Sequence, residues 1–294
     1  MIDLLAHLAA ILAPVFLTSA VGFGWVKRGY SFDQGFATRL IAGLATPCLV
    51  FSTLTRLHVT GEDFLLMGGA TLACLVTFFV LGIAGLKLCR LPASVFLPSL
   101  AFPNNGNMGL PVCLFAFGDR GVALATIYFA VICVFQFTLG PLLSSGRFNL
   151  SPLFKAPVVY ATVAALVVIV LHLPVPAWLL NTTGLIGQIC VPLMLLALGV
   201  ALAQLRVANL GRAVTVSLLR FGVGLAGGVL VATLFGFHGA QRGVVILESA
   251  MPVAVFNYLF ALMYDNSPED VAGVIMVSTI LSYVALPFLV AMVI

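Results

Sequence analysis

Apolar runs of about 20 residues recur along nearly the whole chain, and their length is the strongest constraint on its fold. A helix of that length crosses a hydrocarbon layer of ~30 Å. Only helices and closed barrels satisfy all of their backbone hydrogen bonds in lipid. The 294 residues are 62% hydrophobic and 7% charged, whereas a soluble domain carries roughly 25% charged residues. The sequence therefore predicts an all-α membrane protein.

Charged and turn-rich gaps divide the chain into ten predicted transmembrane spans. Their approximate limits are 4–25, 33–54, 64–88, 92–117, 121–143, 153–173, 181–203, 213–236, 242–264 and 270–293. If the N-terminus lies outside, ten basic residues fall on the cytoplasmic side, namely Lys27, Arg28, Arg39, Lys87, Arg90, Arg147, Lys155, Arg206, Arg212 and Arg220. Only Arg56, Arg120 and Arg242 then fall outside. Because Lys and Arg favour cytoplasmic loops, both termini are predicted outside.

Proline-broken stretches interrupt two of these spans near their middle. The first is PNNGNMGLP at residues 103–111, and the second is AMPVAVFN at residues 250–257. Proline removes a backbone donor and clashes with the preceding turn, so Pro103 and Pro252 are predicted to break their helices. In a membrane, such a break is tolerated only where it is buried in protein or lines a wet cavity. The two breaks therefore predict a substrate site near the bilayer midplane.

The two halves of the sequence show signs of an internal repeat. Matching positions, in pairs, are Pro103 with Pro252, Val122 with Val271, and Pro47 with Pro192. Five spans per half is an odd number, so the second half must enter the membrane upside down relative to the first. This predicts a 5+5 inverted repeat with halves at residues 1–147 and 148–294, a common transporter architecture. The alternative is a chance match among the 15 prolines.

A helix that resumes after a break offers unpaired N–H groups and the positive end of its dipole, which bind anions such as carboxylates. Asparagine side chains add uncharged donors and acceptors, and a glycine lets a ligand approach the backbone. The predicted substrate-binding residues are Asn104, Asn105, Gly106, Asn107 and Met108 at the first break, and Pro252, Val253 and Asn257 at the second. The alternative is that the asparagines only satisfy the broken backbone, and both roles can coexist.

Apart from Asp33 and Asp270, the first residues of their spans, Glu248 is the one carboxylate within the predicted spans, and it lies one helical turn before Pro252. An intramembrane acid is a functional candidate by default, so Glu248 is predicted to couple transport to a proton or a sodium ion. Alternatively it packs by hydrogen bonding or pairs with Arg220 or Arg242. Arg220 itself is expected to extend to the cytoplasmic face, or else to attract substrate. Gln136 is expected to form a hydrogen bond between helices.

Other kinds of chemistry find little support in the sequence. The six cysteines show no metal-ligand spacing, and no nucleophile lies in a recognisable pattern with a base. The basic residues are scattered and form no nucleic-acid patch. The start of the chain, MIDLLAHLAA, has no basic residue, so its first span is predicted to be retained rather than cleaved. We therefore expect no enzyme activity, no cofactor and no nucleic-acid partner.

Three motifs resemble the auxin efflux carrier family, which includes plant PIN proteins and bacterial organic-anion permeases. They are PNNGNMGLP at 103–111, AMP at 250–252 and LFALMYDNSPEDVAGVIM at 259–276. The resemblance implies a fold like that of bile-acid symporters and sodium/proton antiporters, with crossing helices four and nine. It also implies a scaffold at residues 1–56 and 153–205 and a mobile transport domain at 62–147 and 211–294. Pro103, Asn104, Asn107 and Pro252 match the crossing positions of the family.

The resemblance further implies a secondary transporter in a bacterial inner membrane. Its substrate would be an auxin-like monocarboxylate or a dicarboxylate such as malate or malonate. Access would alternate by an elevator-like motion of the transport domain, and the protein would form a homodimer through its scaffold. One alternative is a cation/proton antiporter of similar fold, which predicts paired intramembrane acids where this sequence has only Glu248. Another alternative is an anion sensor that binds its ligand without moving it.

Overall fold

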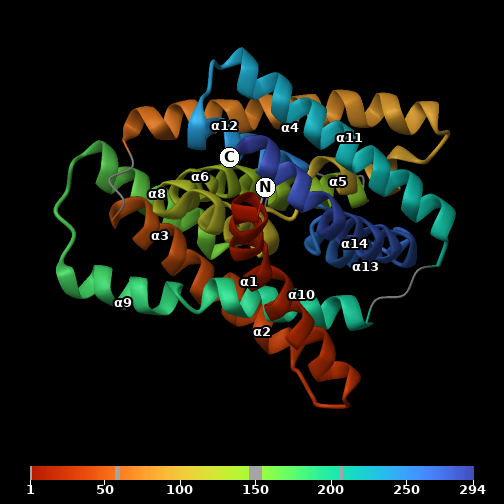
Figure 1. The fold of residues 1–294 in the computed structure, drawn as a ribbon, viewed down its shortest axis with the longest axis horizontal. Helices are drawn as coiled ribbons and strands as arrows, with labels where there is room; N and C mark the ends of the chain where they lie inside the picture. Colours follow the sequence, from red (N-terminus) through yellow and green to blue (C-terminus); the bar gives the residue numbers. More distant parts are fainter. Residues whose placement is uncertain (1, 57–59, 146–153, 205–207) are drawn as a thin grey trace.

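The computed structural model describes residues 2–56, 60–145, 154–204 and 208–294, with side chains described from residue 13 onward (Figure 1). Its helices are α1 (Ile2–Lys27), α2 (Gln34–Leu40), α3 (Thr46–Arg56), α4 (Gly61–Leu88), α5 (Ala93–Ala101), α6 (Leu110–Ser145), α8 (Pro157–Val170), α9 (Ala177–Gly187), α10 (Cys190–Gln204), α11 (Leu210–Leu234), α12 (Gly239–Ala250), α13 (Phe256–Met263) and α14 (Pro268–Val293). Two π-helical turns, η1 (Ile41–Ala45) and η2 (Asn105–Gly109), precede α3 and α6. Arg147, Arg206 and the predicted junction between residues 147 and 148 lie outside the described residues.

Within the described residues every regular element is helical, apart from an isolated β-bridge between Pro103 and Val253. Six helical stretches there are long and apolar enough to cross a bilayer: Gln34–Arg56, Gly61–Leu88, Asn105–Ser145, Ala177–Gln204, Leu210–Leu234 and Pro268–Val293. Large apolar side chains also face outward, including Leu65, Leu88 and Phe288, which are 77%, 86% and 74% exposed. Exposed apolar surface of this kind suits lipid rather than water. The predicted all-α membrane class is therefore confirmed.

A sharp turn at Gly118 divides α6 into two helical segments. Gly118 has φ 61° and ψ −150°, a backbone conformation open almost only to glycine. Gly121 then allows the two segments to approach each other closely, because a β-carbon there would lie 2.3 Å from the carbonyl oxygen of Cys113. The polar stretch at residues 118–121, predicted as a gap between spans, is thus the turn between these segments.

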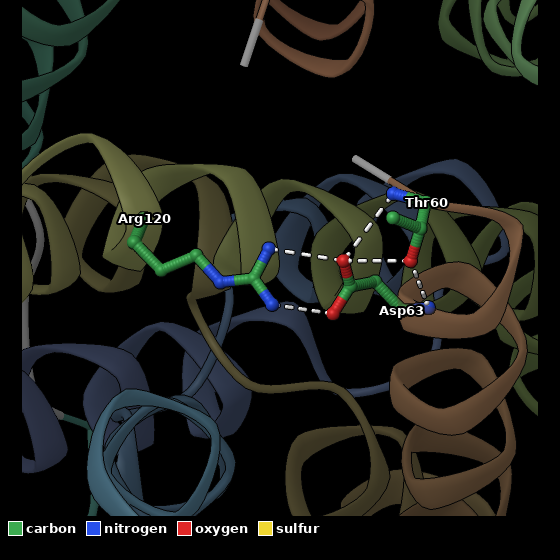
Figure 2. Close-up of polar contacts among 3 residues, drawn as sticks. All are labelled: Thr60, Asp63 and Arg120. Carbon is green, nitrogen blue, oxygen red and sulfur yellow. Dashed lines mark hydrogen bonds and ion pairs between the residues drawn. The ribbon is translucent and has the colours of Figure 1, made fainter. Parts of the chain in front are cut away.

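The start of α4 is fixed by a capping box that also holds an ion pair (Figure 2). The hydroxyl of Thr60 accepts from the Asp63 amide at 3.0 Å, and the Thr60 amide donates to Asp63 Oδ2 at 3.2 Å. Arg120, just past the turn of α6, points its guanidinium at the same carboxylate, with Nη1 3.0 Å from Oδ2 and Nη2 bonded to Oδ1. Asp63 therefore joins the first turn of α4 to α6.

Replacing Asp63 by alanine is expected to lower the free energy of unfolding by about 1–2 kcal/mol, since it removes both a helix cap and an ion pair. Asp270 is the matched control, because its carboxylate forms an ion pair with Arg212 at 3.1 Å, between α14 and α11. Asp270→Ala should cost less, since the hydrogen bonds that Asp63 makes as a cap have no counterpart there. Thermal unfolding in detergent measures both variants, and equal midpoints would contradict this role of Asp63.

The helices pack into two groups. In one, α1 packs against α10, and α3 packs against α8 and α9. In the other, α11 packs against α4, α12 and α14, and α12 packs against α6. In Figure 1, α4 crosses the top of the view and α11 slopes down from it to the right, whereas α9 and α10 cross the lower half, with the end of α1 and α2 projecting below them. The first group comes from residues 2–56 and 157–204, and the second from residues 61–145 and 210–293.

Close glycine contacts hold α1 against α10. A β-carbon at Gly22 would lie 2.2 Å from the carbonyl oxygen of Leu196, and one at Gly199 would lie 1.8 Å from that of Ser19. Small residues at such positions let two membrane helices approach backbone to backbone. The contact between these two helices therefore depends on the absence of side chains at both glycines.

Candidate functional site

The two broken helices meet at their interruptions. Helix α5 ends at Ala101 and the chain becomes helical again at Asn105, whereas α12 ends at Ala250 and α13 begins at Phe256. The intervening segments pair as an antiparallel bridge. The amide of Asn104 donates to the Pro252 carbonyl at 2.7 Å, and the amide of Ala254 donates to the Phe102 carbonyl at 3.1 Å. Each break therefore satisfies backbone groups of the other.

Asparagines extend this reciprocity to the helix ends. The side-chain amide of Asn105 donates to the Glu248 carbonyl at 2.9 Å, near the end of α12. That of Asn257 donates to the Pro98 and Phe102 carbonyls, both at 3.2 Å, at the end of α5. The Pro98 and Glu248 carbonyls also accept from the amides of Phe102 and Met251, the residues that end their helices, at 3.0 and 3.4 Å. Each asparagine thus belongs to the helix that follows one break and caps the helix that precedes the other break.

Arg220 of α11 lies under the same crossing and is completely buried. Its Nε donates to the Met251 carbonyl at 3.1 Å, its Nη1 donates to the Leu100 carbonyl at 2.5 Å, and its Nη2 donates to the Ser249 carbonyl. The expectation that this side chain extends to the cytoplasmic face was wrong. The guanidinium instead donates to carbonyls at the ends of α5 and α12. The sequence around residue 220 gives no sign of these partners.

Glu248 is also completely buried, and the start of the resumed helix surrounds its carboxylate. Asn105 Nδ2 donates to its Oε2 at 2.5 Å, and the Cys113 thiol lies 3.6 Å from its Oε1. A β-carbon at Gly109 would lie 2.2 Å from Oε2. Residues 105, 109 and 113 share one helix face. Among the described residues the ion pairs are Arg120 with Asp63 and Arg212 with Asp270, so Glu248 pairs with neither Arg220 nor Arg242.

A cavity of about 340 Å³ lies beside the crossing. One wall is the start of the resumed helix, from Pro103 through Asn107. Facing elements contribute apolar side chains, and Lys155, which is exposed, is also part of the lining. The other lining residues are Ile41, Ala42, Thr46, Phe129, Ile132, Cys133, Gln136, Phe137, Pro141, Ala156, Pro157, Val158, Met194, Ala254, Phe256, Leu259, Phe260 and Met263. Both π-helical turns therefore line the cavity, as such turns frequently do at functional sites.

Several buried polar atoms in this lining have no hydrogen-bond partner among the described residues. They are Asn104 Nδ2, Asn105 Oδ1 and Gln136 Nε2, in side chains that are 4%, 1% and 4% exposed. An unpaired buried donor costs about 1–3 kcal/mol, so such atoms call for a ligand or water. The expectation that Gln136 bonds to a neighbouring helix was wrong for this amide nitrogen. Two of the three atoms are N–H donors, which suit an anion.

A second cavity of about 230 Å³ adjoins the first. Asn107, Phe256, Ile41 and Leu259 line both cavities. The second cavity also has the polar residues Gln34, Thr38, Gln204 and Tyr258 in its lining. Asn107 therefore lies where the two spaces meet, on the first turns of the resumed helix.

The predicted substrate-binding residues divide into two sets. Asn104, Asn105, Gly106 and Asn107 line the larger cavity. The others, Met108, Pro252, Val253 and Asn257, line neither cavity. The Val253 amide donates to Ser278 Oγ at 3.2 Å, and Met108 Sδ lies 3.5 Å from Ser282 Oγ. Sequence reasoning did not select Gln136 or Lys155 for the site. The part of the chain with described side chains holds no cluster of three or more metal-ligating residues.

Comparison with known proteins places these features in context. The family described as membrane transport protein matches residues 7–148 and 142–290. A protein of Methanothermobacter thermautotrophicus, named an uncharacterized transporter, is 27% identical over 267 residues that cover 87% of each chain. A protein of Methanocaldococcus jannaschii, also named an uncharacterized transporter, is 24% identical over 281 residues, which cover 88% of this chain and 89% of the relative.

Proposed function

Since the chain belongs to the membrane transport protein family, the family of the auxin efflux carriers, we propose that it is a secondary active transporter of a small organic carboxylate. Membership makes the protein an integral membrane transporter rather than an enzyme. The substrate, the route and the coupling are our proposal. The observation that carries it is the pair of unpartnered amide donors, Asn104 Nδ2 and Gln136 Nε2, in the lining of the larger cavity.

The lining of this cavity suits a carboxylate with an apolar body. The two carboxylate oxygens would accept from Asn104 and Gln136, and the ammonium group of Lys155 would attract the negative charge as the anion enters. Asn107 supplies a further polar side chain, and the phenylalanines of the lining would contact the rest of the molecule. We propose an auxin-like monocarboxylate or a malate- or malonate-type dicarboxylate as the substrate.

The position of the cavity supports a mechanism of alternating access. Its walls come from both helix groups: Ile41, Val158 and Met194 belong to the first group, and Asn104 and Gln136 belong to the second. We assign the first group, residues 1–56 and 153–205, to a scaffold that forms a homodimer, and residues 62–147 and 211–294 to the moving crossover domain. Motion of the second group against the first would carry the bound anion across the membrane.

The reciprocal caps support the inverted repeat. Asn105 and Asn257 each cap the helix of the other half, and the bridge between Pro103 and Val253 joins equivalent segments. This exchange is what two copies of one five-helix unit in opposite orientation would produce. We therefore propose ten spans in two halves, with both termini outside and the basic loops in the cytoplasm of a bacterial inner membrane.

Coupling, in this proposal, occurs at Glu248 through a proton or a sodium ion. Asn105 lines the cavity and donates to the Glu248 carboxylate, so it links the two sites directly. An anion in the cavity and an ionised Glu248 would repel each other in a medium of low dielectric. A cation bound at Glu248 removes that repulsion, so anion and cation are expected to bind together. A cation/proton antiporter is less well supported, because the side chains bonded to Glu248 are neutral.

Gln136→Leu is expected to weaken apparent substrate affinity about tenfold to a hundredfold, because it removes a hydrogen bond to a charged group. The measurement is uptake of labelled indole-3-acetate, malate and malonate into proteoliposomes. Gln188→Leu is the matched control, since Gln188 is an exposed glutamine that is absent from the cavity lining. Equal affinities in the two variants would remove Gln136 from the site. Binding of a carboxylate without any uptake by the wild type would instead support the anion sensor.

A further inference from the structure

Three backbone carbonyls from two different helix ends converge on one side chain. The carbonyl of Leu100 belongs to the last turn of α5, that of Ser249 to the last turn of α12, and that of Met251 to the residue just after it. Carbonyls at a helix carboxyl end have no partner in their own helix and carry the negative end of its dipole. The arrangement is therefore a concentration of negative potential, and the guanidinium of Arg220 occupies it.

The charge of Arg220 is balanced by these carbonyls rather than by an acid. Among the described residues neither ion pair involves Arg220. The guanidinium carbon also lies 4.8 Å from the centroid of the Phe78 ring. The hydroxyl of Ser249, the residue that supplies one of the carbonyls, bonds to Tyr128. A buried charge is costly unless it is fully hydrogen-bonded. Arg220 therefore behaves as a cation bound by backbone oxygens.

Glycines of α11 bring the carbonyls within reach. A β-carbon at Gly224 would lie 2.2 Å from the Ser249 carbonyl oxygen, and one at Gly228 would lie 2.8 Å from Ser249 Cβ. Gly224 is one helical turn after Arg220, so the same face of α11 both supplies the guanidinium and admits the end of α12. The site is thus built by three helices, α5, α11 and α12.

We propose that the guanidinium of Arg220 is a built-in cation, which takes the position where a crossing of this kind would otherwise hold a sodium ion. Freed carbonyls and half-helix carboxyl ends coordinate sodium in transporters with broken helices. Here their lone pairs already accept hydrogen bonds from a covalently attached cation. Arg220 is therefore a positioning residue, and carboxylate transport needs no sodium. This inference rests on the proposed function and leaves the proton as the coupling ion at Glu248.

The first test uses the wild-type protein. Its thermal midpoint in detergent and its carboxylate uptake are measured in sodium chloride and in choline chloride at equal ionic strength. A bound ion raises the midpoint of the folded state by mass action, so the expected result is the same midpoint and the same uptake in both salts. A midpoint or an uptake rate that rises with sodium would overturn the inference. A protein that moves no carboxylate in either salt sinks the proposed function alone, since the midpoints still report on sodium.

The second test compares Arg220→Lys with Arg220→Met, which differ in charge while both retain a long side chain. We expect Met to lower uptake by about tenfold or more, because three carbonyls lose their donors, and Lys to retain more of it. Sodium should raise the thermal midpoint of the Met variant but not that of Arg212→Ala, the control from an exposed arginine of the same helix. Lys and Met variants that both fold and then show the same uptake and the same response to sodium would show that charge is not what the site requires.

Discussion

Gly224→Ala is expected to abolish uptake and to lower the free energy of unfolding by about 3 kcal/mol or more. The added β-carbon would lie 2.2 Å from the Ser249 carbonyl oxygen and 3.0 Å from Arg220 Nη2. The carbonyl has little freedom to move aside, because Arg220 donates to it. The end of α12 would have to shift away from α11, and the bridge between the two breaks would shift with it. Thermal unfolding in detergent and uptake in proteoliposomes measure the two effects.

Gly222 provides the control, since it lies two residues away on the same helix. A β-carbon there meets nothing within 4 Å, and alanine stabilises a helix relative to glycine by about 1 kcal/mol. Gly222→Ala should therefore keep full uptake and an unchanged or higher thermal midpoint. If both alanine variants lose stability to the same degree, the close approach of α11 to α12 is not what limits the substitution.

Glu248→Gln is expected to uncouple transport from a proton gradient while leaving the fold intact. The glutamine oxygen can still accept from Asn105, and the bond from Asn105 to the backbone carbonyl of residue 248 does not depend on the side chain. With one proton per anion, a gradient of one pH unit supports up to about tenfold accumulation beyond that set by the other driving forces. The variant should lose this accumulation and keep exchange of labelled for unlabelled substrate.

The measurement is uptake into proteoliposomes whose interior is more alkaline than the medium. Glu269→Gln is the control, because Glu269 is an exposed acid at the start of α14. It should respond to the gradient as the wild type does. A Glu248→Gln protein that keeps its whole response to imposed pH and sodium gradients would rule out Glu248 as the coupling residue.

The class of fold was predictable because hydrophobic length is a local property. Runs of about 20 apolar residues leave few structures other than membrane helices. The position of Asn104 and Asn107 near a cavity could also be predicted, since a helix break within lipid must be buried in protein or line a water-filled cavity. The residues around the first break carry this signal in their own sequence, as prolines and amides within an apolar run.

The positions of Gln136, Lys155 and Arg220 could not be predicted from the sequence in the same way. When a helix is apolar on every side, its pattern does not reveal which face meets a cavity. Gln136 and Lys155 reach the cavity through tertiary packing. Arg220 binds carbonyls of residues 100, 249 and 251, and these come together only once the two breaks have paired.

Closeness to a break in the sequence did not tell whether a residue lines a cavity. Met108 and Val253 lie beside the interruptions, but serines of α14 contact them and they line neither cavity. Asn257 was selected as a ligand residue; its amide nitrogen caps α5, and its Oδ1 is buried without a hydrogen-bond partner among the described residues. Its role matches the alternative in which asparagines satisfy the broken backbone. Asn105 combines both roles, because it caps α12 and also lines the cavity.

During synthesis the ribosome completes Pro103 149 residues before it reaches Pro252. The amide of Asn104 and the carbonyl of Phe102 are therefore made long before Pro252 and Ala254, their partners, exist. Unpaired groups of this kind are costly in hydrocarbon. The nascent first half has to be sheltered, by the insertion machinery or by water, until the second half arrives. A chain truncated before residue 250 would keep these backbone groups unpaired, and we expect quality-control proteases to degrade it.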